Sequence, residues 1–418
     1  MSAESVEGRS PLAIAAFRKY LAARWLASVS VQMLSVAVGV QVYAATGRTR
    51  DLAWVGLVQF VPMLVFVLPA GRVADATDGR SIALVCDVGF ALCAALLLAS
   101  TYVSAGALWV VFSALFVLGF SRAFYGPAVQ SLLPRIVGTS LLSRAVATQS
   151  GAWQVAAVSG PALAGALYFG GSPRVVYAVA LVGTLIALAL MAWLRLDRSV
   201  AERVVSESKA PSRWYEGLSY VWRNDLLLAV LSLDFLAVFL GGATALIPVM
   251  VKDVLHRGES TVGLLRAAPS IGAALVALWL ARNPIRSSAG IKLVGSVVLF
   301  GAFTVLFGVS RTVWLSFAAL LGLGAVDTVS VVLRATLVQK GSPTALRGRV
   351  AAVNQLFMSA SNELGEVESG LLAEWVSAAT AIVIGGVGAM VVAVATGARF
   401  RALRELESVE SVRPEPHG

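Results

Sequence analysis

The sequence is short of charge. Asp, Glu, Lys and Arg make up 13% of its 418 residues, whereas 58% of the residues are hydrophobic. Soluble domains carry about 25% charged residues, so this composition excludes an ordinary soluble domain. Only helices and closed β-barrels satisfy their backbone hydrogen bonds in lipid. Because the apolar stretches are about 20 residues long and do not alternate like barrel strands, they predict an all-α polytopic membrane protein.

Histidine and cysteine are also scarce, with two of each. Cys86 and Cys93 lie about 10 Å apart along one predicted helix, too far for a disulfide within it. His256 falls in a predicted outer loop and His417 in the C-terminal tail, so no zinc-ligand spacing is present. We expect no metal site and no cofactor. The sequence has no Gly-x-x-x-x-Gly-Lys-Ser/Thr loop, which argues against transport driven by nucleotide hydrolysis.

The net charge of +10 is not arranged as a nucleic-acid surface. There is no basic stripe with interleaved aromatic residues, and most Lys and Arg lie between apolar runs. If both termini are cytoplasmic, 26 of the 33 Lys and Arg, Arg334 among them, fall on the inner side of the membrane, and Arg266 is one of the seven on the outer side. The positive-inside rule therefore predicts an inner (plasma) membrane protein with cytoplasmic N and C termini, and no nucleic-acid partner.

Twelve apolar segments follow one another along the chain. They cover residues 17–44, 52–70, 82–102, 107–126, 147–169, 175–194, 225–250, 261–281, 291–309, 313–333, 350–375 and 378–398. We expect two six-helix bundles over 1–195 and 225–400, a cytoplasmic linker over 196–224 and a cytoplasmic tail over 401–418. The end of the linker, 214–222, is rich in aromatic residues and is predicted to be an interfacial helix.

An internal repeat appears at an offset of 205 residues. Residues Arg144–Ala147 match Arg349–Ala352, and both glycines of Gly160–Gly165 fall on those of Gly365–Gly370. The fifth and eleventh segments are therefore predicted to be equivalent helices of duplicated halves. Two parallel six-helix repeats around a midplane site are a transporter architecture.

The loop between the second and third segments carries a family signature. It has Gly71, then Asp75 four residues on, then Arg80 before the third segment. In this loop the chain resembles the major facilitator superfamily, which implies twelve helices in two pseudo-symmetric six-helix bundles and a gating role for these three residues. Ala76 and Gly79 stand where family members often carry Arg, which weakens that role. Arg80 can pair with a carboxylate across the cytoplasmic surface; the alternative is a solvated turn.

A closer resemblance is to the branch that contains enterobactin exporters and related permeases. It rests on Ala123–Ala128, Leu346–Val350 and the acidic run Ser361–Gly370. The fifth segment is also similar to the Gly-Pro element of antiporters, although Ala replaces two expected glycines. Gly160, Pro161 and Gly165 would kink this helix and let another helix approach, packing one half against the other. An ordinary membrane-helix kink is the alternative.

Three glutamates within six residues interrupt the apolar segment 350–375. Carboxylates at lipid depth are costly and usually face a bundle interior or a water-filled cavity. At 100° per residue, Glu363 and Glu366 share one stripe with Gly370, and Glu368 points about 140° from Glu363. Two carboxylates one turn apart repel, so one should hold a proton unless a cation is near. We predict that Glu363 or Glu366 couples transport to protons; the alternative is a structural network with neighbouring helices.

Other charges in apolar segments form a second tier of candidates. Arg24 and Arg122 are the cations considered for the glutamates, and either could instead extend to the membrane surface. Asp234 and Asp327 lie well inside their segments, and the family resemblance places those segments around the transport cavity. Each is a candidate for binding substrate or proton. Asp87 belongs to a segment that the family places at the periphery, so capping or loop pairing is expected.

These features favour a monomeric secondary active exporter of an amphipathic small molecule, siderophore-like or drug-like, driven by inward proton flow through alternating access. Its expected partners are the substrate, the proton and the bilayer. Lysophospholipid flipping or uptake by the same fold is the alternative. A membrane enzyme would need a catalytic constellation, for which only His256 is available. A signalling receptor would normally append a soluble domain, which we do not expect here.

Overall fold

The structure is a computed structural model. It describes residues 10–103, 108–138, 141–168, 172–194, 215–283, 285, 287–343 and 346–408. The chain separates into two compact units, unit 1 (1–45 and 58–211) and unit 2 (46–57 and 212–418). The division falls at Pro211, inside the predicted linker, and the first turns of the second long helix group with unit 2.

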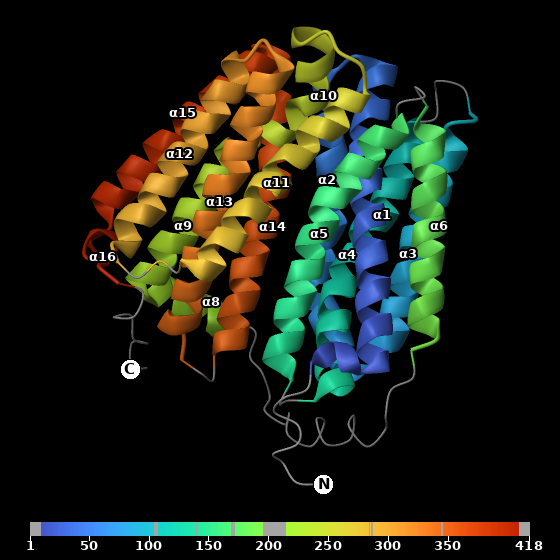
Figure 1. The fold of residues 1–418 in the computed structure, drawn as a ribbon, viewed down its shortest axis with the longest axis horizontal. Coiled ribbons are helices and arrows are strands. Elements are labelled where there is room, and N and C mark those ends of the chain that lie inside the picture. Colours follow the sequence, from blue (N-terminus) through green and yellow to red (C-terminus); the bar gives the residue numbers. More distant parts are fainter. Residues whose placement is uncertain are drawn as a thin grey trace. The chain divides into compact units, whose positions relative to one another are not determined.

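Unit 1 is built from long helices that follow the first six predicted segments (Figure 1). They are α1 (Ala15–Thr46), α2 (Thr49–Ala76, shared with unit 2), α3 (Gly79–Ser100), α4 (Leu108–Val137), α5 (Leu142–Leu167) and α6 (Pro173–Ala192). Ser172 caps α6 by accepting a hydrogen bond from the Arg174 amide at 3.3 Å, with Pro173 at the first helical position. This combination is typical of a helix start.

Unit 2 follows the other six segments (Figure 1). Its long helices are α9 (Asp225–Leu240), α11 (Ser260–Arg282), α12 (Ala289–Val309), α13 (Val313–Gly341), α14 (Arg347–Trp375) and α15 (Ala378–Arg399), with the short helices α8 (Tyr215–Arg223), α10 (Ile247–Val249) and α16 (Arg401–Arg404). The predicted segment 225–250 is not one helix. It breaks after α9 at Gly241 and continues as a 3-10 turn (Ala243–Leu246), α10 and a π-helical turn (Met250–Val254).

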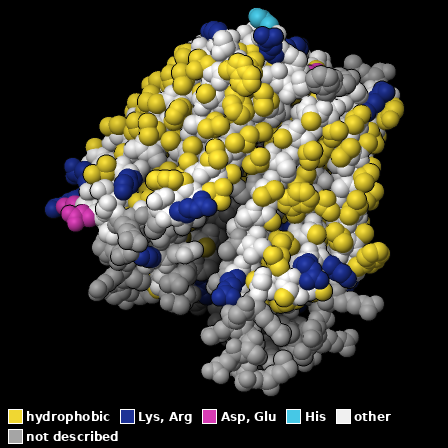
Figure 2. Space-filling model, viewed as in Figure 1, with side chains coloured by type: hydrophobic (Ala, Val, Ile, Leu, Met, Phe, Trp, Pro, Cys, Tyr) yellow, Lys and Arg dark blue, Asp and Glu magenta, His cyan; other side chains and the backbone are white. Residues whose placement is uncertain are grey.

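Each unit has its own apolar core. In unit 1, Phe17, Tyr20, Leu132 and Met191 are fully buried around small residues such as Ala83. In unit 2 the core joins α9, α12, α13 and α15 through Leu233, Leu293, Leu337, Ala389 and Ala393. Outer helix faces carry exposed large hydrophobic side chains, which Figure 2 shows in yellow, with most visible Lys and Arg near the helix ends. This is the pattern of helices that face lipid.

Among the described residues, ten helices are long and apolar enough to cross a bilayer. The long helices outside this set are α5 and α14, which are the two that the internal repeat pairs. In α14 the reason is its polar and acidic content. One of the two long helices outside the set is therefore the helix that carries the predicted coupling glutamates.

The interfacial helix predicted at the end of the linker is α8, and it packs into unit 2. A Cβ on Gly217 would lie 2.8 Å from the Arg349 carbonyl carbon, and Arg349 forms an ion pair with Glu216. The Tyr220 hydroxyl donates to the Gly341 carbonyl at 2.7 Å. Tyr220 is thus an internal contact and not a membrane anchor, whereas Trp222 is exposed.

Candidate functional site

The predicted gating loop is described in part. The side chains of Gly71 and Asp75 lie outside the described residues. Arg80 donates from Nε to the Met191 carbonyl at 3.4 Å and from an Nη to the Ala192 carbonyl at 2.5 Å. These carbonyls end α6, where a cation is favoured by the helix dipole. Arg80 therefore ties α3 to α6 and pairs with no carboxylate among the side chains that the structure describes. The gating role stays a prediction.

The Gly-Pro element packs within unit 1. A Cβ on Gly160 would lie 2.5 Å from the Gln32 Cβ and 3.0 Å from the Val29 carbonyl oxygen, both on α1. Pro161 lies inside α5, which continues through it, and Gly165 is buried. The expected close approach of another helix is present, but the neighbour of Gly160 is α1 of the same unit. The predicted packing of one half against the other stays a prediction.

The three glutamates of the acidic run in α14, Glu363, Glu366 and Glu368, lie within unit 2 and are partly buried. A Cβ on Gly56 of α2 would lie 3.5 Å from the Glu366 Cβ, and one on Gly370 would lie 2.9 Å from the Ala53 Cβ. Glu366 and Gly370 therefore face the same segment of α2, as the predicted stripe requires. The cation that acts on Glu366 within unit 2 is Arg266 of α11. The predicted topology instead places Arg266 on the outer side of the membrane.

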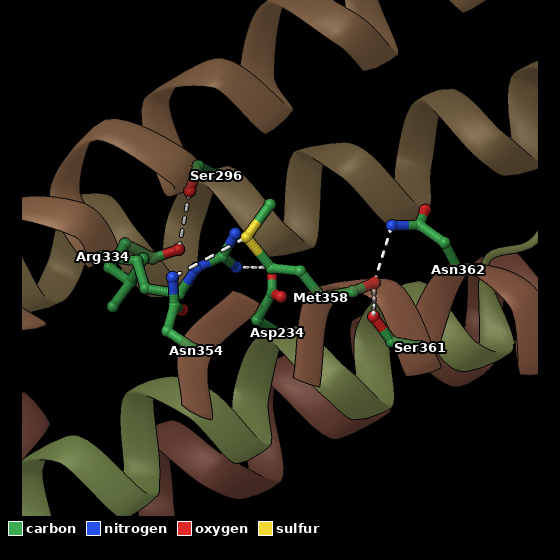
Figure 3. Close-up of polar contacts among 8 residues, drawn as sticks. Asp234, Ser296, Arg334, Asn354, Met358, Ser361 and Asn362 are labelled. Carbon is green, nitrogen blue, oxygen red and sulfur yellow. Dashed lines mark hydrogen bonds and ion pairs between the residues drawn. The ribbon is translucent and has the colours of Figure 1, made fainter. Parts of the chain in front are cut away.

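The strongest charge interaction inside unit 2 joins α9 to α13. Asp234 and Arg334 form an ion pair whose side chains are 9% and 2% exposed, drawn in Figure 3. Arg334 had been counted as a cytoplasmic topology charge, but α13 runs on to Gly341 and carries it into the protein. Two charges taken out of water are costly unless each compensates the other. The pair therefore holds both helices in one arrangement.

A second acid faces the same region. Asp327 lies seven residues before Arg334 on α13, two turns and about 10 Å away along one helix face. Asp234 and Asp327 line a small cavity together with Ser296, Ser330 and Phe300, with room for about one water molecule. Among the described residues, Asp327 has no ion pair or side-chain hydrogen bond. Arg334 thus compensates the charge of Asp234, and Asp327 is the acid of the two without a cation in contact, an arrangement that favours the uptake of one proton by Asp327.

Polar side chains continue along α14 beside this region. Asn354 donates to the Met358 sulfur at 3.8 Å, while Ser361 and Asn362 donate to the Met358 carbonyl at 3.0 and 2.8 Å (Figure 3). Phe357 packs edge-on against Phe235 of α9, with ring centres 5.7 Å apart. The same face of α14 therefore joins the helix of Asp234 to the acidic run.

The arginines considered in unit 1 differ in their surroundings. Arg24 donates to the Tyr20 hydroxyl at 3.3 Å and lies over two tyrosine rings, so it is part of an internal cluster. Arg122 is exposed on α4. Asp87, expected to cap or pair in a loop, is instead 1% exposed inside the unit. No group of three His, Cys, Asp or Glu suited to a metal ion occurs in the described part of the chain.

A model of the Major Facilitator Superfamily matches residues 20–366. The chain belongs to this superfamily. Its fold is therefore twelve transmembrane helices in two pseudo-symmetric six-helix bundles. The crystal structure of a POT family transporter in complex with 5-aminolevulinic acid, also a facilitator-type fold, superposes with a TM-score of 0.73 at 12% identity, covering 93% of this chain and 96% of that one.

Two facilitator relatives align over most of their length. The enterobactin exporter EntS of Citrobacter koseri is 27% identical over 395 residues, which is 91% of this chain and 87% of the relative. Macrolide efflux protein A of Streptococcus pyogenes is 22% identical over 352 residues, which is 83% of this chain and 86% of the relative. The superfamily indicates a multi-pass membrane transporter and not an enzyme.

Proposed function

We propose that this chain is a proton-coupled exporter of a small amphipathic molecule, siderophore-like or drug-like. Superfamily membership makes it a transporter, and the names of two relatives describe export of a siderophore and of a macrolide. The observation that carries the proton coupling is the buried set of Asp234, Arg334 and Asp327 in unit 2. Its two acids line one small cavity, and its cation pairs with one of them, Asp234.

The charges of this set define how it would work. With both acids ionised, Arg334 neutralises one of them and a negative charge remains in a low-dielectric interior. A proton on Asp327 makes the set neutral while the Asp234–Arg334 pair stays intact. Protonated and deprotonated forms then stabilise different conformations of unit 2, and a gradient that loads the proton on one side drives the cycle. Alternating access converts that bias into export.

The glutamates of α14 are a second candidate for the coupling group. Glu366 has a buried cation beside it, and it packs against Gly56 of α2 within unit 2. A change in its charge would act on the contact between α14 and the start of α2. Glu363→Gln and Glu366→Gln are tested in the same assay, and full coupling in both variants would exclude this candidate.

The proposed function is tested by transport into inverted membrane vesicles. The panel contains siderophores, macrolide drugs and lysophospholipids, each offered with and without an acidic vesicle lumen. We expect one member to accumulate only with the gradient and to be lost when a protonophore collapses it. Asp327→Asn should keep substrate exchange but lose gradient-driven accumulation. Glu405→Gln, an exposed acid at the C-terminal end, should behave as wild type.

Three outcomes would contradict the proposal or part of it. Accumulation that ignores the pH gradient would remove proton coupling. If Asp327→Asn accumulates substrate as wild type does, the buried set in unit 2 is not the coupling site, and the α14 glutamates become the leading candidate. If no member of the panel accumulates although folded protein is present, export of these three classes is overturned.

A further inference from the structure

Unit 1 holds a buried carboxyl group that the proposed coupling site does not use. Asp87 is the ninth residue of α3, about 12 Å along the axis from its first residue, so it caps nothing. It is 1% exposed. Neither of its carboxyl oxygens has a hydrogen-bond partner among the described residues. A buried polar atom without a partner is uncommon and calls for an explanation.

Few ionisable groups act on this carboxyl. They are Arg24 from α1, Tyr125 from α4 and the neighbouring Cys86. The Tyr125 hydroxyl lies near the carboxyl and is itself buried without a well-formed hydrogen bond. Arg24 acts on Asp87 electrostatically, but no ion pair within 4.0 Å joins them in the described structure.

Arg24 is held by aromatic rings instead. Its guanidinium carbon lies 6.0 Å from the ring centre of Tyr20 and 5.9 Å from that of Tyr125. It also donates to the Tyr20 hydroxyl, which in turn donates to the Val129 carbonyl at 2.9 Å. Cation–π contacts of this kind are favourable but weaker than an ion pair away from water. The cation is thus near the acid and engaged elsewhere.

An ionised carboxylate in this place would have the Tyr125 hydroxyl as its one neighbouring donor among the described residues and no contact ion pair, which is strongly unfavourable in an apolar interior. We propose that Asp87 is a proton-binding residue of the transport cycle, protonated in the conformation described, with Arg24 as its counter-ion in the deprotonated state. This rests on the proposed function, in which protons drive the cycle.

The position of the Asp87 carboxyl gives its charge a structural effect. Asp87 on α3 lies near Arg24 of α1 and Tyr125 of α4, so loss of its proton would draw Arg24 away from the two tyrosines and toward α3. Since α1 also packs tightly against α5 at Gly160, the change would reach a further helix of unit 1. A two-state arrangement of this kind can be biased by a single proton.

The first test needs no substrate. Infrared difference spectra of the purified protein are recorded during a pH titration, with the proton as the only ligand. We expect a carbonyl band of a protonated carboxyl group that disappears as the pH rises and is missing in Asp87→Asn. The matched control is Asp78→Asn, an exposed acid just before the same helix that pairs with Arg135 at 3.5 Å. It should keep the band.

Two further variants separate proton binding from a structural role. Arg24→Gln removes the counter-ion, so the Asp87 band should persist to higher pH. Asp87→Glu keeps a titratable group and should show a displaced band, which covers the case in which Asp87→Asn does not fold. The proposal is overturned if wild type and Asp87→Asn give the same pH-difference spectrum, or if the band does not respond to Arg24→Gln.

The closing experiment is gradient-driven accumulation in inverted vesicles. We expect Asp87→Asn to exchange substrate but not to accumulate it, whereas Asp78→Asn accumulates it as wild type does. If accumulation by wild type does not depend on the pH gradient, the proposed function fails, and the inference about Asp87 fails with it. If wild type depends on the gradient and Asp87→Asn does so equally, only the inference about Asp87 fails.

Discussion

The buried pair of Asp234 and Arg334 shows how much one residue can matter in an apolar interior. Each side chain compensates the charge of the other, because both are almost wholly buried. Removing one partner of such a pair leaves an uncompensated charge and costs about 3–5 kcal/mol. Replacing both partners with apolar residues of similar size is often neutral or stabilising. The two kinds of change therefore separate stability from function.

We expect Asp234→Asn to lower stability by about 3–5 kcal/mol, measured as a fall in apparent melting temperature in detergent. The double variant Asp234→Leu with Arg334→Met should melt near wild type and yet lose proton-driven transport. Arg401→Gln breaks an exposed pair with Glu405 and should leave the melting temperature close to that of wild type. A double variant that still couples transport to protons would show the pair to be structural only.

Sequence could find some of these residues and not others. Asp234 and Asp327 stand out because each is an acid well inside an apolar segment. Arg334 and Arg266 were assigned to segment ends, since a basic residue there usually marks the membrane surface. The spacing of seven residues between Asp327 and Arg334 was an available signal, because it places both on one helix face. The isolation of Asp87 and the tyrosine contacts of Arg24 depend on tertiary packing, which no local pattern encodes.

At the scale of elements, close approach between helices rests on a few glycines. A Cβ on Gly324 of α13 would collide with the Pro269 carbonyl oxygen of α11, and one on Gly272 would collide with the Leu321 carbonyl. Backbone cannot move aside as a flexible side chain can. Membrane helices have no hydrophobic driving force between them, and small residues at such crossings let them pack closely. The contact between α11 and α13 therefore depends on the absence of a methyl group.

Gly324→Ala should separate α11 from α13 and destabilise the protein by about 1–3 kcal/mol, as overpacking does. Gly295→Ala in α12 is the matched control, since a Cβ there meets no atom within 4 Å. The control should be neutral or gain up to about 1 kcal/mol from helix propensity. Melting temperatures of the two variants in one detergent provide the comparison. Equal melting temperatures would show that the crossing tolerates a methyl group.

The elements themselves were largely predictable, because twenty-residue apolar runs are an unambiguous signal. Their ends were not. The segment predicted over 313–333 ends where apolarity ends, while α13 continues to Gly341. Helical hydrogen bonding persists beyond the apolar part, since polar side chains can reach water from there. The break after α9 was not predicted, because Gly241 and Gly242 lie in an otherwise apolar run. The need for glycine there comes from tertiary packing, since a Cβ on Gly242 would collide with the Gly365 carbonyl.

At the scale of the whole molecule, each unit carries its own buried acid with an arginine nearby. Unit 2 has Asp234 with Arg334, in contact, and unit 1 has Asp87 with Arg24, not in contact. The internal repeat does not predict this likeness, since an offset of 205 residues places neither acid on the other. The similarity is one of chemistry and not of alignment. If both units bind protons, the transport rate would depend on pH through the acid of unit 1 and through the acids of unit 2.

The orientation of the whole chain rests on its charge distribution, in which 26 of 33 Lys and Arg fall on one side when both termini are inside. Single-cysteine labelling tests it, because native Cys86 and Cys93 are buried and give little background. His256 and Ser287 are both exposed and lie in loops on opposite sides of the predicted topology. We expect a membrane-impermeant maleimide to label His256→Cys in intact cells, and Ser287→Cys only after permeabilisation. The unsubstituted protein is the background control.

Labelling of Ser287→Cys in intact cells, with His256→Cys protected, would place both termini outside. Such a result would also reverse the direction in which an inward proton gradient acts on Asp327 and Asp87.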